Sequence, residues 1–92
     1  MPEAASQWTI TIHRETKREL RRLPKRVLQS ALEAIRALAD DPYPVGCSRL
    51  KGHESLYRIR VGDWRIVYDV DGATHTVTVL RVASRGEVYR DL

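Results

Sequence analysis

Three segments of alternating residues, joined by two short turns, constrain the fold of this chain more than any other feature. They are LYRIRV (residues 56–61), WRIVYDV (64–70) and HTVTVLRV (75–82). Alternation with a period of two residues is typical of half-buried strands. Gly62-Asp63 and Asp71-Gly72 supply residues that tolerate positive φ in hairpin turns. The pattern therefore predicts an antiparallel meander of three strands.

The N-terminal half predicts one more strand and two helices. Residues 8–12 (WTITI) alternate like a strand, whereas from Arg14 the apolar residues fall at helical spacing until Pro24 interrupts them. Pro24 suits the first position of a second helix, which we expect to end near Asp40 because Asp41 precedes a proline. One apolar stripe runs along this second helix and comprises Leu28, Ala31, Leu32, Ile35, Leu38 and Ala39.

The order of these elements, βααβββ, predicts a small α+β domain in which two N-terminal helices pack on one face of an antiparallel sheet. A chain of 92 residues can build one hydrophobic core. We therefore expect a single domain over residues 1–92, with residues 1–7 as a flexible tail. The apolar runs are only as long as strands, and the N-terminus lacks the pattern of a signal peptide.

The charge of the chain favours an anionic partner, with nucleic acid as the leading class. Sixteen Lys and Arg oppose twelve Asp and Glu, which gives a formal charge of +4 and an isoelectric point near 9.6. The densest basic segment is the first helix and its exit, with Arg14, Lys17, Arg18, Arg21, Arg22, Lys25 and Arg26. These residues predict contacts with a phosphate backbone. The alternative is a solvated helix face with local pairs such as Glu15–Arg18.

Arginines also gather on the predicted sheet. Arg58 and Arg60 share one face of their strand, and the short hairpin brings Arg65 near them if its face matches. Polar residues on the exposed face of a sheet need no functional explanation. Three adjacent cations repel one another, however, and we interpret the trio as a binding site for an anion.

The C-terminal segment ASRGEVYRDL adds Arg85 and Tyr89, four residues apart. A guanidinium offers paired donors to a phosphate, and a phenol can stack on a base or transfer a proton. The alternative is a terminal turn in which Tyr89 serves as a packing anchor.

Cysteine and histidine chemistry is not indicated. Cys47 is the only cysteine, which excludes an intramolecular disulfide and suits a reducing cytoplasm. The three histidines lie far apart in the sequence, without the spacing of metal ligands. His13 is expected at the entry of the first helix, and Thr16 with Glu19 has the spacing of a capping box.

Four motifs give the chain, from Trp8 to Leu92, a resemblance to the RelE/ParE toxin superfamily. They are KRELRRLP, RLKG, LYRIRVGDWRIVYDVDG and VLRVASRGEVYRDL. The resemblance implies the same βααβββ order and the toxin of a type II toxin–antitoxin system in the cytoplasm. It also implies a RelB-like antitoxin as partner, and it implies no cofactor or metal.

The RelE branch of that superfamily implies a ribosome-dependent endoribonuclease that cuts mRNA in the A site. In this branch the ribose 2′-OH attacks the adjacent phosphate. Matching motif to motif, the catalytic set is Arg58, Arg60, Arg65, Arg85 and Tyr89. The residues expected to contact RNA or the ribosome are Lys17, Arg18, Arg21, Arg22, Lys25, Arg26 and, as a weaker match, Lys51.

Two departures from the RelE pattern bear on mechanism. Some relatives carry lysines where this chain has Arg58 and Arg60, and arginine is a poor proton acceptor, so the general base stays open. The segment between Arg85 and Tyr89 is also shorter than in some members. The alternative is a ParE-type toxin that poisons DNA gyrase without cutting RNA. Arg65 does not separate the branches, whereas Arg58 and Arg60 together with Tyr89 favour RelE.

Overall fold

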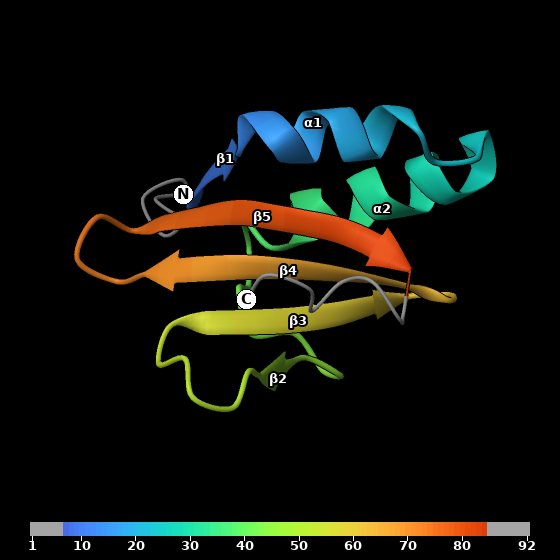
Figure 1. Cartoon of the computed structure of the whole chain (residues 1–92). Helices are drawn as coiled ribbons and strands as arrows, with labels where there is room; N and C mark the ends of the chain where they lie inside the picture. The colour runs from blue at the N-terminus through green and yellow to red at the C-terminus, as the bar shows by residue number, and fades with distance from the viewer. Residues whose placement is uncertain (1–6, 85–92) are drawn as a thin grey trace.

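The computed structural model describes residues 7–84 and confirms the α+β class (Figure 1). Its elements are β1 (Thr9–Ile12), α1 (Arg14–Arg21), α2 (Lys25–Ala37), β2 (Ser48–Arg49), β3 (Leu56–Val61), β4 (Trp64–Asp71) and β5 (Thr76–Ser84). The helices lie together on one side of a five-stranded sheet, as the apolar stripe predicted. Within the described residues, neither helix is long and apolar enough to cross a membrane.

The predicted meander is present. Strands β3, β4 and β5 pair antiparallel in chain order, and Gly62 takes φ of 61° in the first turn. The second turn lies between Asp71 and Thr76, one residue further along the chain than predicted, and the Asp71 carboxylate accepts hydrogen bonds from the Ala73 and Thr74 amides. Here His75, with φ of 56°, takes the left-handed conformation expected of Gly72.

The sheet is mixed rather than wholly antiparallel, and its order is β1-β5-β4-β3-β2. Strand β1 runs parallel to β5, with Thr9 opposite Thr76 and Ile12 opposite Val79. Alternation shows that a segment is a strand, but it does not show which strand lies beside it or in which direction. Strand β2 was also not predicted, because two residues are too few to display a period.

The hydrophobic core lies between the helices and the near face of the sheet. Strand β4 supplies Ile66 and Tyr68, both fully buried, and α2 supplies Ile35. Helix α1 contacts β5, and α2 reaches β3. The helix boundaries differ slightly from those predicted: Pro24 caps α2 instead of opening it, and the helix ends at Ala37. The Tyr68 hydroxyl donates a 2.7 Å hydrogen bond to the Pro42 carbonyl, which ties the loop after α2 to the sheet.

Candidate nucleic-acid interface

The arginines of β3 and β4 meet on the face of the sheet that points away from the helices. Arg60 lies directly opposite Arg65 in the register, and Arg58 lies opposite Val67. The residues between them, Ile59 and Ile66, are buried in the core, so the arginines project to the other side. The prediction that Arg65 shares a face with Arg58 and Arg60 is confirmed. We call this surface, defined by Arg58, Arg60 and Arg65, the arginine face.

The arginine face is held in a partly preformed arrangement. Arg60 is exposed, whereas Arg58 and Arg65 are half-buried. The Arg65 guanidinium donates from Nη1 to the Trp64 carbonyl at 3.2 Å and to the Gly62 carbonyl at 3.5 Å. The β3–β4 turn therefore orients this side chain before any ligand binds.

Two arginines oppose each other in the half of the arginine face beside the β3–β4 turn. The register partner of Arg60 is another arginine, Arg65, and the partners of Arg58 are Ser48 and Val67. None of these partners is acidic. Asp69 shares the face further along β4, where its carboxylate accepts a hydrogen bond from the Ser55 hydroxyl. Repulsion between directly opposed cations is unfavourable, and a phosphate would relieve it.

A fourth arginine, Arg81, joins this face because the strand pairing is irregular. The register shifts between Val67 and Tyr68, so that Val67 faces Arg81 whereas Tyr68 faces Val79. Leu80 is thus the extra residue of a β-bulge. Sequence reasoning missed Arg81. The signal was present in TVTVLRV, where two apolar residues in succession, Val79 and Leu80, break the alternation.

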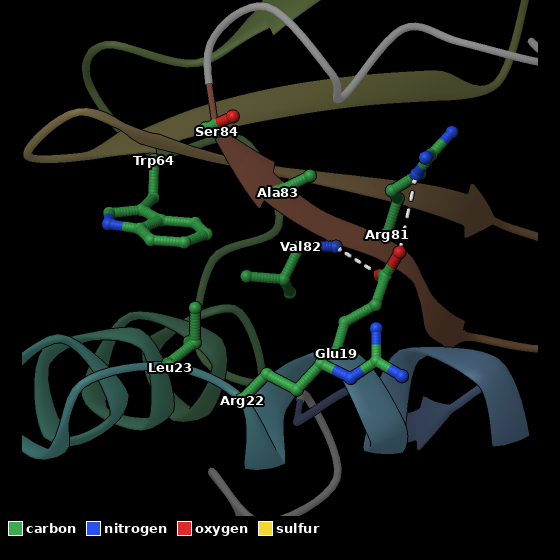
Figure 2. Close-up of a pocket in the computed structure, with 8 residues that line it drawn as sticks. All are labelled: Glu19, Arg22, Leu23, Trp64, Arg81, Val82, Ala83 and Ser84. Carbon is green, nitrogen blue, oxygen red and sulfur yellow. Dashed lines mark hydrogen bonds and ion pairs between the residues drawn. The ribbon is translucent and has the colours of Figure 1, made fainter.

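Glu19 of α1 holds the outer edge of β5 beside Arg81 (Figure 2). One carboxylate oxygen accepts the Val82 amide at 2.8 Å, and the other lies 3.3 Å from Arg81 Nε. Both side chains are mostly buried, with 28% of Glu19 and 21% of Arg81 exposed. Arg22, Leu23 and Trp64 complete a groove next to this pair, together with Val82, Ala83 and Ser84.

The predicted capping box is wrong, and the reason lies in the length of β1. Strand β1 ends opposite Val79, so beyond this point side chains of α1 form hydrogen bonds with the backbone of β5. The Thr16 hydroxyl donates to the Val79 carbonyl at 3.2 Å, and Glu19 binds the Val82 amide as described above. The helix is capped instead by His13, whose Nδ1 accepts the Glu15 amide at 3.2 Å. His13 is therefore a helix-entry residue, as predicted.

The basic residues of the helices form a second surface, of which Arg22 alone lines the groove beside Arg81. All of the predicted contact residues there are exposed, namely Lys17, Arg18, Arg21, Arg22, Lys25 and Arg26. The predicted local pair Glu15–Arg18 is present at 3.9 Å, but both side chains are more than half exposed, so its contribution is small. Because α1 lies on the core side of the sheet, the other residues of this surface do not lie on the arginine face.

Of the remaining predicted residues, Lys51 alone is described, and it lies outside the arginine face. Lys51 is exposed in the β2–β3 loop, where it lines an open hollow with Arg49 and His53. This loop precedes β3, at the end of the strand opposite to the β3–β4 turn. Arg85 and Tyr89 lie outside the described residues, and their roles stay predictions.

Three tyrosines form a chain of ring contacts on the core side of the sheet. Tyr57 meets Tyr43 edge-on with centroids 5.0 Å apart, and stacks on Tyr68 at 6.0 Å. Burial raises the pKa of Tyr68 and, with the neighbouring Tyr57, the pKa of Tyr43. Raised values make both phenols poor proton acceptors at neutral pH. In residues 7–84, no three His, Cys, Asp or Glu side chains are grouped as metal ligands would be.

Comparison with known families decides the classification. Residues 10–89 match the family model described as "ParE toxin of type II toxin-antitoxin system, parDE". The chain belongs to the RelE/ParE family of type II toxins.

Individual RelE/ParE relatives match over most of their length. Toxin RelG of Mycobacterium tuberculosis is 31% identical over 84 residues, which cover 90% of this chain and 97% of RelG. Toxin RelE of the same organism is 30% identical over 82 residues, which cover 88% of this chain and 84% of that toxin. Among solved structures, an archaeal RelE–RelB complex from Pyrococcus horikoshii matches with a TM-score of 0.78 and 29% identity, covering 89% of this chain and 99% of that one.

Proposed function

We propose that this RelE/ParE toxin is a ribosome-dependent endoribonuclease that cleaves mRNA in the A site and so inhibits translation. The observation that carries the proposal is the arginine face, where Arg58, Arg60 and Arg65 share one side of the sheet and Arg60 lies directly opposite Arg65. The similarity to toxins named RelE and RelG supports the same branch of the family. The proposed substrate, mRNA in the A site of a translating ribosome, implies that the protein acts in the cytoplasm.

The proposed reaction is an internal transfer at one phosphodiester. The 2′-oxygen attacks phosphorus, the bond to the 5′-oxygen breaks, and the products are a 2′,3′-cyclic phosphate and a free 5′-OH. One proton leaves the 2′-OH and one reaches the departing 5′-oxygen. The three arginines of the arginine face, Arg58, Arg60 and Arg65, stabilise the charge that develops on the phosphate. This electrostatic stabilisation is stronger in a site that is shielded from water. This scheme requires no metal.

Proton transfer is assigned to residues outside the arginine trio. Arginine keeps its proton at any physiological pH, so the trio binds and stabilises charge but does not accept the 2′ proton. We assign to Tyr89 a base-stacking role or help in removing that proton, and to Arg85 the stabilisation of the leaving oxygen. A Tyr89→Phe variant separates the two roles, because phenylalanine still stacks but transfers no proton.

A RelB-like antitoxin is the proposed partner. The Pyrococcus horikoshii relative was solved as a RelE–RelB complex. The arginine face suits an acidic or amphipathic segment, since a carboxylate offers guanidinium groups the same planar acceptors as a phosphate. A bound antitoxin would then occupy the surface that binds RNA.

The ParE alternative is carried by the family model itself, whose description names ParE. It predicts that the protein inhibits supercoiling by purified gyrase and leaves mRNA intact.

One experiment compares both functions. Purified protein is added to a translating extract, where breaks in the mRNA are mapped by primer extension, and in parallel to a gyrase supercoiling assay. The RNase proposal predicts A-site breaks that Arg58→Ala and Arg60→Ala strongly reduce, and normal supercoiling. Intact transcripts with inhibited supercoiling would overturn it in favour of the ParE function. A ribosome-free RNA sample tests the dependence on the ribosome.

A further inference from the structure

We propose that Arg81 is a fourth phosphate-binding residue of the arginine face, and that Glu19 of α1 positions it. This inference rests on the proposed function, because it assigns a further contact to the same RNA substrate. It is carried by the strand register at the β5 bulge and by the contact between the Glu19 carboxylate and Arg81 Nε.

The bulge determines which way Arg81 points. Val77 and Val79 are buried in the core, so strict alternation along β5 would also direct Arg81 into the core and Val82 out of it. The extra residue, Leu80, reverses this: Val82 is buried and Arg81 lies on the far side of the sheet, opposite Val67. Figure 2 shows Val82 directed toward Leu23 and Arg81 directed away from the helices. Bulges of this kind commonly re-aim a side chain beside a functional site.

The register then places Arg81 and Arg58 on either side of one buried residue. Val67 of β4 faces Arg58 of β3 on one side and Arg81 of β5 on the other. Neighbouring strands lie about 4.8 Å apart, so the two arginine backbones are separated by about 10 Å. Side chains as long as arginine reach across such a gap from both sides. In the proposed complex, the RNA backbone therefore contacts both arginines above the buried side chain of Val67.

Glu19 holds the Arg81 guanidinium at its Nε atom. It reaches Arg81 from the helix side because β1 stops opposite Val79 and leaves the β5 edge to α1. The Val82 amide bond anchors one carboxylate oxygen, so the other is held beside Nε. A guanidinium carries five N–H donors, and in the proposed complex the phosphate binds the Nη groups while Nε keeps its contact with Glu19. Holding a flexible side chain in one orientation lowers the entropy lost when RNA binds.

The test measures binding to a short single-stranded RNA whose riboses are 2′-O-methylated, so that the 2′-oxygen cannot attack. The variant Arg81→Gln removes the charge but keeps an amide donor for Glu19 and most of the stem. Affinity is measured by fluorescence anisotropy over a range of salt concentrations. We expect binding about tenfold weaker and a salt slope about 0.7 smaller, the value for one phosphate contact on a single strand. The matched control is Arg36→Gln, an exposed arginine on α2, which should leave both quantities unchanged.

The positioning role of Glu19 is tested by a double-mutant cycle. Glu19→Gln keeps a carbonyl acceptor for the Val82 amide but removes the charge beside Arg81. We expect about fivefold weaker RNA binding in the wild-type background and no further loss in the Arg81→Gln background. If Glu19→Gln lowers the RNA affinity equally in both backgrounds, Glu19 has only a structural role. Tighter binding by Glu19→Gln would mean that its charge merely repels RNA, and would also overturn the positioning role.

The outcomes separate this inference from the proposed function. If the wild-type protein cleaves mRNA in the extract but Arg81→Gln keeps the wild-type salt slope, the inference fails and the RNase proposal stands. If the wild-type protein leaves transcripts intact, the RNase proposal fails, and a smaller slope for Arg81→Gln would still identify Arg81 as a phosphate contact. Thermal unfolding of each variant confirms that the comparisons use folded protein.

Discussion

Replacing Arg60 by glutamine should make this protein more stable while it abolishes most of its activity. Arg60 lies directly opposite Arg65 in the strand register, and it is exposed. Directly opposed side chains begin about 5 Å apart at Cβ. Two unit charges about 7 Å apart repel by about 0.6 kcal/mol in water. The Arg60→Gln variant should therefore unfold with a free energy about 0.5 kcal/mol higher than that of the wild type at low salt.

Salt dependence identifies the cause. The Debye length falls from about 10 Å at 0.1 M salt to about 3 Å at 1 M, so the gain in stability should almost vanish at high salt. Urea unfolding measures this gain in stability. If the free energy of unfolding falls by about 1 kcal/mol per molar urea, the gain shifts the unfolding midpoint by about 0.5 M. The control is Arg49→Gln, an exposed strand arginine whose register partner is the uncharged Tyr57.

The same variant should cleave mRNA about 100-fold more slowly, the usual cost of losing one donor that stabilises charge in a transition state. A variant that is less stable at low salt, or whose stability gain is the same at 1 M salt, would refute the repulsion argument. Wild-type cleavage by Arg60→Gln would refute the catalytic role of this position.

Two further predictions concern the core and the basic helices. Tyr68→Phe removes the hydrogen bond to the Pro42 carbonyl and should lower the free energy of unfolding by about 1 kcal/mol at pH 7. The fold raises the pKa of the Tyr68 phenol above its unfolded value near 10. The stabilisation by Tyr68 is therefore complete below about pH 10 and is lost as the pH rises above that value, because the unfolded chain then releases the phenol proton. Denaturation at pH 7 and at pH 11 should show that the difference in stability between the wild type and Tyr68→Phe closes. A Lys17→Ala/Arg21→Ala double variant should bind ribosomes more weakly and with a smaller salt slope, because both side chains are exposed on α1. Sedimentation at several salt concentrations measures both quantities. Equal slopes for the variant and the wild type would show that these residues form only a solvated helix face.

The arginine trio was predictable because two local rules determine it. Alternation places Arg58 and Arg60 on one face, and the short turn at Gly62 fixes which residue of the next strand lies opposite Arg60. Neither rule depends on distant parts of the chain. The fold class and the two helices followed from equally local periodicities.

Two features that sequence reasoning missed, the contacts of Glu19 and the place of Arg81, depend on how segments pair in the fold. Glu19 has the spacing of a capping residue, but the end of β1 determines that it binds the Val82 amide of β5 instead. Arg81 falls at a core position under strict alternation, and only the bulge at Leu80 moves it to the arginine face. Arg85 and Tyr89, assigned from the resemblance, stay predictions.

The parallel pairing of β1 with β5 has a consequence for how the protein forms. The meander needs only neighbouring segments, whereas β1 must wait for a strand made near the other end of the described chain. Contacts between distant segments are slow to form because a long loop must close first. We expect β1, and with it the α1 contacts that hold the β5 edge, to dock late. A nascent toxin would then carry an incomplete Arg81 site until synthesis had passed β5, which under the proposed function delays activity against the ribosome that is making it.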